Sequence, residues 1–182
     1  MKITTVEALI LHSKKSYTQG HGLVDAIESP SRRVLTDRYA GGRHLCTYPD
    51  GEQTVLVRIE TDSGLTGWGE AHAPYAPTVT QTLIVDLLAP LMLGQDPMAS
   101  DVLWERMYAA MRLRGHNTGF TMEAIAGVDI ALWDLRGQMT GQPIYALLGG
   151  PYRTRLPAYA SGVPGANADD RRAAAEAYLD AG

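Results

Sequence analysis

The amino-acid sequence predicts an α+β fold, in which a three-stranded antiparallel meander precedes a helical bundle and a further strand and helix begin an α/β repeat. Two apolar segments in the first third of the chain have strand spacing and meet at a turn signal. Later segments carry apolar residues three and four positions apart, as helices do. The character of the chain then changes after Gly150. This order of elements is typical of an α+β unit followed by the start of an α/β unit.

Three segments account for the predicted meander. Residues 2–11 are rich in aliphatic and β-branched types, which predicts the first strand. Residues 54–61 alternate between apolar and polar side chains, as a half-buried strand requires. Turn residues at 62–64 and the sequence "LTGWGEA" after them complete a hairpin. The inward-facing residues of the middle strand would be Val55, Val57 and Ile59.

Helical spacing predicts three helices after the meander. Pro77 opens the first helix, and Pro90 ends it or bends its last turn. The Asp-Pro pair at 96–97 is a start signal for the second helix, which Gly115 ends. The third helix follows from Thr121. The apolar positions of the first helix are Val79, Leu83, Leu87 and Leu91, and those of the third are Ile125, Val128, Leu132, Leu135 and Met139.

The third helix contains two acids and an arginine, which raises the question of catalysis. Asp129 and Asp134 are roughly 140° apart around a helix of about 3.6 residues per turn, so their carboxylates do not converge. We therefore interpret Asp134 and Arg136 as partners of backbone groups or charges near the helix end, because buried charges must be paired. A row of small residues on the same helix would let another backbone approach closely: Ala124, Gly127 and Ala131.

The residues after Gly149 and Gly150 predict a second domain. "RLPAYAS" reads as a short strand and "RRAAAEAYLDAG" as the helix that follows it. We therefore assign residues 1–150 to the first domain and residues 151–182 to the beginning of a second, incomplete one. A glycine after a helix normally leads into another element, so the end at Gly182 reads as an interruption.

Composition indicates a soluble globular protein without nucleic-acid or membrane partners. The 182 residues are 45% hydrophobic and 20% charged, with a net charge of -4 and no basic run to neutralise phosphates. The longest apolar run, "LIVDLLAPLML", is too short to cross a bilayer. The one cysteine, Cys46, cannot form an internal disulfide, and the N-terminus lacks a signal-like apolar block. We therefore expect a cytoplasmic protein.

The sequence contains no compact signature of metal or nucleotide binding. Its five histidines are scattered, without an HExxH motif. Glu70 and His72 share a strand face, which is a weak metal signal, and we interpret them as a packed or hydrogen-bonded pair at a strand end. The glycine-rich "GLTGWGEA" lacks the GxGxxG order, so its glycines instead predict close strand packing around Trp68.

A long polar segment, residues 12–52, lacks clear periodicity, which is typical of a functional loop. We expect this loop to close over a ligand. Arginine binds a carboxylate through two parallel hydrogen bonds, so an anionic substrate would suit the loop. Arginines on a long loop are nevertheless more often simply solvated, and we favour that reading for any single one. The residues able to contact an anion are His21, Arg32, Arg33, Tyr39, Arg43 and His44.

Several motifs together resemble the N-terminal part of the enolase superfamily, in its mandelate racemase and muconate lactonizing enzyme branch. They are the order strand, long loop and hairpin, then "GLTGWGEA", "AIAGVDIALWDLRGQMTGQPIYALLGG" and "LPAYAS". The resemblance covers nearly the whole chain. It implies that residues 1–150 form a capping domain and that residues 151–182 are the first β/α unit of a truncated TIM-type barrel.

The resemblance also implies chemistry, namely removal of the proton α to a carboxylate while Mg²⁺ holds the enediolate. In the family the lysine base and three metal-binding acids lie on later barrel strands, so no catalytic residue or metal ligand is expected in this chain. Substrate-covering roles would fall on the long loop and on the loop after "GWGE". Within those loops we expect Arg33, Tyr39, His44 and Tyr75 to face the substrate.

We therefore expect the N-terminal portion of a magnesium-dependent sugar-acid dehydratase, with a racemase or epimerase as the alternative. Arginine and histidine in the covering loop suit a hydroxylated, anionic substrate. The chain alone should be inactive, and the resemblance implies a homo-oligomer at full length. A hypothesis of another class is a stand-alone, non-catalytic binding or assembly module with the capping fold. The module would be monodisperse, whereas the enzyme fragment would expose apolar residues in "LPAYAS".

Overall fold

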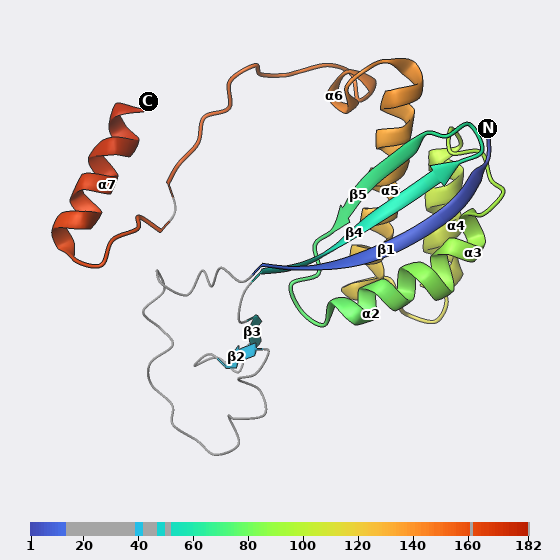
Figure 1. Cartoon of the computed structure of the whole chain (residues 1–182), viewed down its shortest axis with the longest axis horizontal. Coiled ribbons are helices and arrows are strands. Elements are labelled where there is room, and N and C mark those ends of the chain that lie inside the picture. The colour runs from blue at the N-terminus through green and yellow to red at the C-terminus, as the bar shows by residue number, and fades with distance from the viewer. Residues whose placement is uncertain (14–38, 42–46, 50–51, 161, 182) are drawn as a thin grey trace. The chain divides into compact units, whose positions relative to one another are not determined.

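The computed structural model describes most of the chain, namely residues 1–13, 39–41, 47–49, 52–160 and 162–181. The chain divides into two compact units, of which the first is Met1–His12 with Gln53–Pro151 and the second is Ser13–Glu52 with Tyr152–Gly182. The first unit contains the predicted meander and helices. Figure 1 shows the elements of both units, coloured along the chain.

A three-stranded antiparallel sheet forms one layer of the first unit. Its strands are β1 (Ile3–Ser13), β4 (Glu52–Thr61) and β5 (Thr66–Ala71), in the order β1-β4-β5. β4 and β5 pair antiparallel with Arg58 opposite Trp68, and Gly64 takes the positive φ that the turn between them requires. The predicted meander is therefore confirmed.

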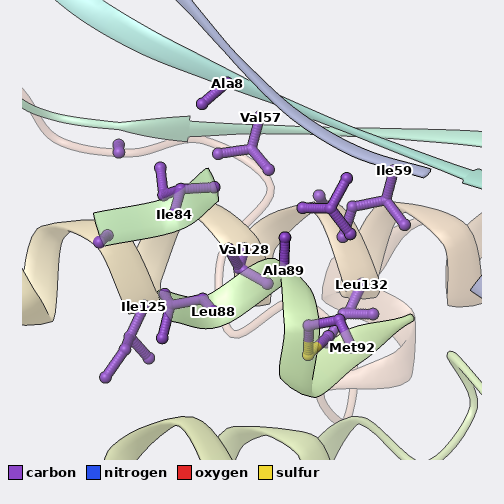
Figure 2. Packing of buried hydrophobic residues seen from close by; sticks show 14 of the residues in the cluster. Ala8, Val57, Ile59, Ile84, Leu88, Ala89, Met92, Ile125, Val128 and Leu132 are labelled. Atoms are coloured by element: carbon purple, nitrogen blue, oxygen red, sulfur yellow. The ribbon is translucent and has the colours of Figure 1, made fainter. Parts of the chain in front are cut away.

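Helices form the second layer and cover one face of this sheet. They are α2 (Pro77–Thr82), the π-helix η3 (Leu83–Leu88), α3 (Ala89–Met92), α4 (Ser100–Arg112), α5 (Phe120–Thr140) and α6 (Ile144–Leu147). Figure 2 shows Val57 and Ile59 pointing from the sheet towards Ile84, Val128 and Leu132 of the helices. Val55, Val57 and Ile59 are all 0% exposed, as the alternation of the middle strand predicted.

The first predicted helix differs from expectation in its buried face and in the effect of Pro90. Val79 is 42% exposed, whereas Ile84, Leu88 and Met92 are buried, so the buried row lies one position further along. The predicted row, which starts at Val79, and the buried row, which contains Ile84, both repeat every four residues and are both largely apolar. The periodicity of the sequence therefore does not decide which of the two rows is buried. Pro90 does not end the helix, because the backbone widens to a π-helix before it and continues as α3.

The second predicted helix begins later than the Asp-Pro signal indicated. α4 starts at Ser100, and Asp96 lies in the preceding turn. The Asp96 carboxylate accepts a hydrogen bond from the backbone N–H of Met98 at 3.0 Å, and its carbonyl accepts from Ala99. The pair therefore forms an Asx-type turn ahead of the helix rather than its cap.

The third predicted helix, α5, lies against β5 at glycine-sized separation. Gly127 is buried, and a Cβ added to it would lie 2.8 Å from the Cβ of Ala71 and 3.0 Å from a methyl group of Val57. On the strand, a Cβ on Gly67 or Gly69 would overlap the backbone of α5. The predicted close approach at the small-residue row is confirmed. The glycines around Trp68 thus permit the close packing of this strand that we expected, and the element that packs against them is a helix.

The described residues of the second unit form a short antiparallel ribbon and a helix. β2 (Tyr39–Gly41) pairs with β3 (Thr47–Pro49), within the segment expected to be a loop throughout. α7 (Ala168–Asp180) confirms the predicted final helix, and Asn167 caps its first turn. The predicted strand in "LPAYAS" is wrong for the described residues 156–160, which form no ladder. A barrel strand needs neighbouring strands to bond with, and no described strand pairs with these residues.

Exposed apolar residues mark this same stretch. Leu156 is 80% exposed and Tyr159 is 89% exposed. The reading of this stretch as the start of an incomplete barrel stays a prediction. Within the described part of the chain, no helix combines the length and apolar character needed to cross a membrane.

Candidate functional site

One end of the three-stranded sheet carries the 72–76 loop, one of the two segments that we expected to cover a substrate. Asp62 donates its N–H to the carbonyl of Lys2 at 2.9 Å, and Arg58 pairs with Glu7 at 2.9 Å, so β1 and β4 run in opposite directions. β1 therefore ends where β4 begins and where β5 ends. We call this the loop end of the sheet. Residues 72–76 leave the sheet at this end, as the loop between β5 and α2 in Figure 1 shows.

The structure describes only some of the site residues that the sequence predicted. Tyr75 lies in the 72–76 loop, where its side chain is 37% exposed. Tyr39 begins β2 and its backbone lies opposite Pro49. Arg33 and His44 lie outside the described residues. Whether Arg33, Tyr39 and His44 approach Tyr75 therefore stays a prediction.

The backbone of the 72–76 loop is held in an uncommon conformation. Ala76 has φ 43° and ψ 54°, the left-handed region that a non-glycine residue seldom adopts. Its carbonyl accepts a hydrogen bond from the N–H of Val79 at 2.8 Å, and the flanking Ala73 and Pro77 are buried. Backbone strain of this kind persists where the surroundings over-determine it, and it clusters at ligand-binding sites. The loop is thus fixed at both ends while Tyr75 projects from it.

Glu123 is a residue of this region that the sequence did not reveal. It lies in the first turn of α5, and its carboxylate accepts a long hydrogen bond, 3.5 Å, from the hydroxyl of the fully buried Thr80. Burial raises the pKa of Glu123, while the Thr80 bond and the nearby His72 oppose that rise. His72 of the 72–76 loop, Thr80 of helix α2 and Glu123 of helix α5 thus lie close enough to interact. No sequence motif links these three positions, so their proximity becomes visible only in the folded chain.

The Glu70 and His72 pair is only partly as expected. Glu70 is hydrogen-bonded, because its carboxylate accepts from the Thr54 hydroxyl at 2.6 Å. His72 is exposed, and its charge acts on Glu123. No group of three or more histidine, cysteine, aspartate or glutamate side chains that could hold a metal ion occurs among the residues that the structure describes. These residues therefore do not fit a magnesium site.

The charged residues of α5 make structural contacts, as predicted. Asp134 accepts a hydrogen bond from the backbone N–H of Trp68 at 2.8 Å. Arg136 donates to the hydroxyl of the buried Ser100 at 2.6 Å and lies over the ring of Trp133, 4.2 Å from its centroid. Both residues thus fasten α5 to its neighbours. Asp129 has a raised pKa, caused first by burial and then by repulsion from Asp101.

Comparison with known proteins identifies the chain's relatives. Residues 46–149 match the family described as mandelate racemase / muconate lactonizing enzyme, N-terminal domain. The chain is 35% identical over 162 residues to the D-galactarolactone cycloisomerase of Agrobacterium fabrum, covering 89% of this chain and 36% of that protein. It is 44% identical over 115 residues to the D-galactonate dehydratase of Verminephrobacter eiseniae, covering 63% of this chain and 29% of that protein. The chain thus spans about a third of the length of these relatives.

Solved structures agree with this assignment. A member of the enolase superfamily from Agrobacterium tumefaciens superposes with a TM-score of 0.84 at 35% identity, covering 98% of this chain and 45% of that one. A mandelate racemase/muconate lactonizing protein from Paracoccus denitrificans, complexed with magnesium, superposes with a TM-score of 0.58 at 32% identity. That match covers 86% of this chain and 32% of the other.

Proposed function

Because this chain belongs to the mandelate racemase and muconate lactonizing enzyme branch of the enolase superfamily, we propose that it is the substrate-covering N-terminal part of a cytoplasmic enzyme that removes the proton α to the carboxylate of a sugar acid. The geometry of the loop end supports this role most directly. The 72–76 loop leaves this end of the sheet and carries Tyr75 next to the left-handed Ala76. Dehydration is the reaction that we propose first, and the dehydratase relative supports it.

Isomerisation is a second candidate for the same site. A cycloisomerase aligns with 89% of this chain, a larger share than the 63% that aligns with the dehydratase. Racemisation or epimerisation would start from the same proton abstraction. The substrate in each case is a hydroxylated carboxylate or a compound derived from one, which agrees with the names of both relatives.

Within this proposal the residues of the chain bind and cover but do not abstract the proton. The Tyr75 hydroxyl would donate a hydrogen bond to a substrate hydroxyl or carboxylate, and His72 would add positive charge on the same side when protonated. Closure of the 14–51 segment would bring Arg33, Tyr39 and His44 to the anion and exclude water. Mg²⁺ would stabilise the enediolate charge, and the described residues supply no cluster to hold it. The base and metal ligands would lie in a barrel outside this chain, and the full-length protein would be a homo-oligomer.

A chimeric enzyme tests the proposal. The 182-residue chain replaces the aligned N-terminal segment of the Agrobacterium fabrum cycloisomerase, and turnover of D-galactarolactone and of a panel of sugar acids is measured with magnesium present. We expect turnover of at least one of these compounds. In the chimera, Tyr75→Phe should raise KM by about tenfold, the effect of one lost hydrogen bond to a charged group, whereas the exposed Tyr145→Phe serves as the matched control.

Two outcomes would contradict the proposal. A folded chimera that turns over none of these compounds would show that the chain does not cover such a site. Equal KM values for the Tyr75→Phe and Tyr145→Phe chimeras would remove Tyr75 from the substrate contacts. A monodisperse 182-residue chain with a cooperative melt would instead favour the stand-alone binding or assembly module.

A further inference from the structure

The free edge of β5 is closed by two side chains of helix α5. Within the described sheet, β5 lies at the edge and β4 pairs with only one of its sides. On the other side, the Asp134 carboxylate accepts from the backbone N–H of Trp68 at 2.8 Å. The Gln138 amide donates to the backbone carbonyl of Thr66 at 2.7 Å and to the same Asp134 oxygen at 3.0 Å. Two backbone groups that a further strand would bind are thereby occupied.

These two contacts reproduce the bonding of one residue in a parallel strand. In a parallel ladder, a single partner residue donates to the carbonyl of residue i−1 and accepts from the N–H of residue i+1. Around Gly67 those two groups are the Thr66 carbonyl and the Trp68 N–H. Gln138 supplies the donor and Asp134 the acceptor. Because the two side chains are four residues apart on a helix, they lie side by side and bond to each other.

Glycine at position 67 makes this arrangement possible. A Cβ on Gly67 would overlap the carbonyl oxygen of Ala131 and lie 2.6 Å from Cγ of Leu135. Without that close approach, the short aspartate side chain would not reach the backbone of the strand. The side-chain closure therefore depends on the same glycine packing that sets the position of α5.

The opposite edge of the sheet is also occupied. The Gln81 amide donates to the carbonyl of Ala8 in β1 at 2.8 Å. At the start of β1, Ile3 donates its N–H to the carbonyl of Gln95 and accepts from the N–H of Gly94. Exposed strand edges are templates for pairing with other chains, and proteins cover them to prevent it. Each edge of this sheet thus has backbone groups that are bonded by residues outside the sheet.

We propose that Asp134 and Gln138 act as a side-chain substitute for a fourth strand, which prevents the β5 edge from pairing with a second copy of this chain. One exposed hydrophobic side chain is available to favour such pairing once the edge opens, because Trp68 of β5 is 44% exposed. The inference is independent of the catalytic proposal, since it concerns only hydrogen bonds within the first unit.

Amide hydrogen exchange, measured residue by residue by NMR at low and high protein concentration, tests this inference. In the full chain, Asp134→Leu should speed exchange of the Trp68 amide roughly 10- to 100-fold at low concentration, the range expected for one lost hydrogen bond to a charged group. The double variant Asp134→Leu/Gln138→Leu should regain protection of the Trp68 amide at high concentration, as edges of two copies pair. The wild-type chain should show no such concentration dependence.

Two further variants separate edge closure from general destabilisation. Asp134→Asn keeps the oxygen that accepts both hydrogen bonds, so its Trp68 exchange should stay close to wild type even if the global stability falls. Gln81→Leu removes the contact at Ala8 on the opposite edge and should leave Trp68 exchange unchanged. Equal Trp68 exchange in Asp134→Leu and wild type would overturn the inference, as would a folded double variant whose Trp68 protection does not depend on concentration.

Discussion

Replacement of Gly127 by alanine measures how tightly α5 packs on the sheet. Two effects oppose each other at this helical position. Alanine favours the helix over glycine by about 1 kcal/mol. The added methyl group, however, would lie 2.8 Å from Cβ of Ala71, 3.0 Å from its backbone nitrogen and 3.0 Å from a methyl of Val57. All three atoms belong to strand residues, and all three contacts are closer than ordinary van der Waals separation by several tenths of an ångström.

Overpacking of a filled core costs about 1–3 kcal/mol, and rigid neighbours place this site towards the upper part of that range. Subtracting the helical gain of about 1 kcal/mol, we expect Gly127→Ala to lower the free energy of unfolding by about 1–2 kcal/mol. Gly137 provides the matched control on the same helix. There the methyl group would meet only the carbonyl oxygen of Gln142, at 2.9 Å, which lies in the turn after α5.

Urea unfolding of the wild type and both variants, followed by circular dichroism, gives the two differences. The Gly137→Ala variant should be less destabilised than Gly127→Ala, because one turn carbonyl can move more easily than two strands. If Gly127→Ala proves more stable than wild type, helix propensity has outweighed packing and the close contact of α5 with the sheet is not as described.

Three other perturbations have defined outcomes. Arg136→Lys should destabilise the chain by about 1–2 kcal/mol, because lysine lacks the planar group that lies over Trp133 and reaches Ser100; an equal free energy of unfolding in urea would contradict this. Asp129 has a pKa raised by burial and by Asp101, so the folded chain holds that proton more tightly than the unfolded chain, whose aspartate pKa is about 3.9. Stability should therefore fall as pH rises from about 4 through the raised pKa. The Asp129→Asn variant should show a smaller fall in urea midpoint between about pH 4 and about pH 7. An equal fall in the variant and the wild type would show that Asp129 does not cause this pH dependence. Gly69→Ala, whose methyl group would overlap the carbonyl of Gly127, should lower the urea midpoint more than Gly127→Ala, and a smaller effect would argue against the predicted contact.

The sequence predicted the sheet and the role of the small residues because both features depend on patterns among residues that are close together in the sequence. Apolar and polar side chains alternate along β4, so only one face of the strand can point into the core, and that face carries Val57 and Ile59. The row of small residues on α5 that contains Gly127 leaves room for another backbone, and strand β5 lies there. The partner of that row was less predictable, because a glycine in a strand indicates close packing without naming the element that approaches.

Features that depend on tertiary contacts could not be predicted. The choice between two apolar rows in the first helix depends on the angle at which it meets the sheet, so Val79 was wrongly placed inside. The contact between Glu123 and Thr80 joins residues 43 positions apart on two helices. The strand expected in "LPAYAS" has the right local composition, but a strand forms only beside partners, and the described chain offers it none.

The residues expected to face a substrate stay predictions. The structure shows that Tyr75 lies in the loop after β5, whose start the end of the alternating run marked, and that Tyr75 is 37% exposed. The left-handed conformation of Ala76 was not visible in the sequence, since alanine carries no preference for it. Loop shape and the residues that face a ligand follow from such conformations.

Turnover by the purified 182-residue chain is the most direct measurement of the central claim, that these residues cover a sugar-acid site and do not themselves move the proton. The chain is incubated with magnesium and a panel of sugar acids and lactones, and α-keto acid formation is followed beside the chimera as positive control. The account predicts product from the chimera and none from the chain. Product from the chain alone, abolished by chelation of magnesium, would show that the base and metal ligands lie within these residues and would contradict the account.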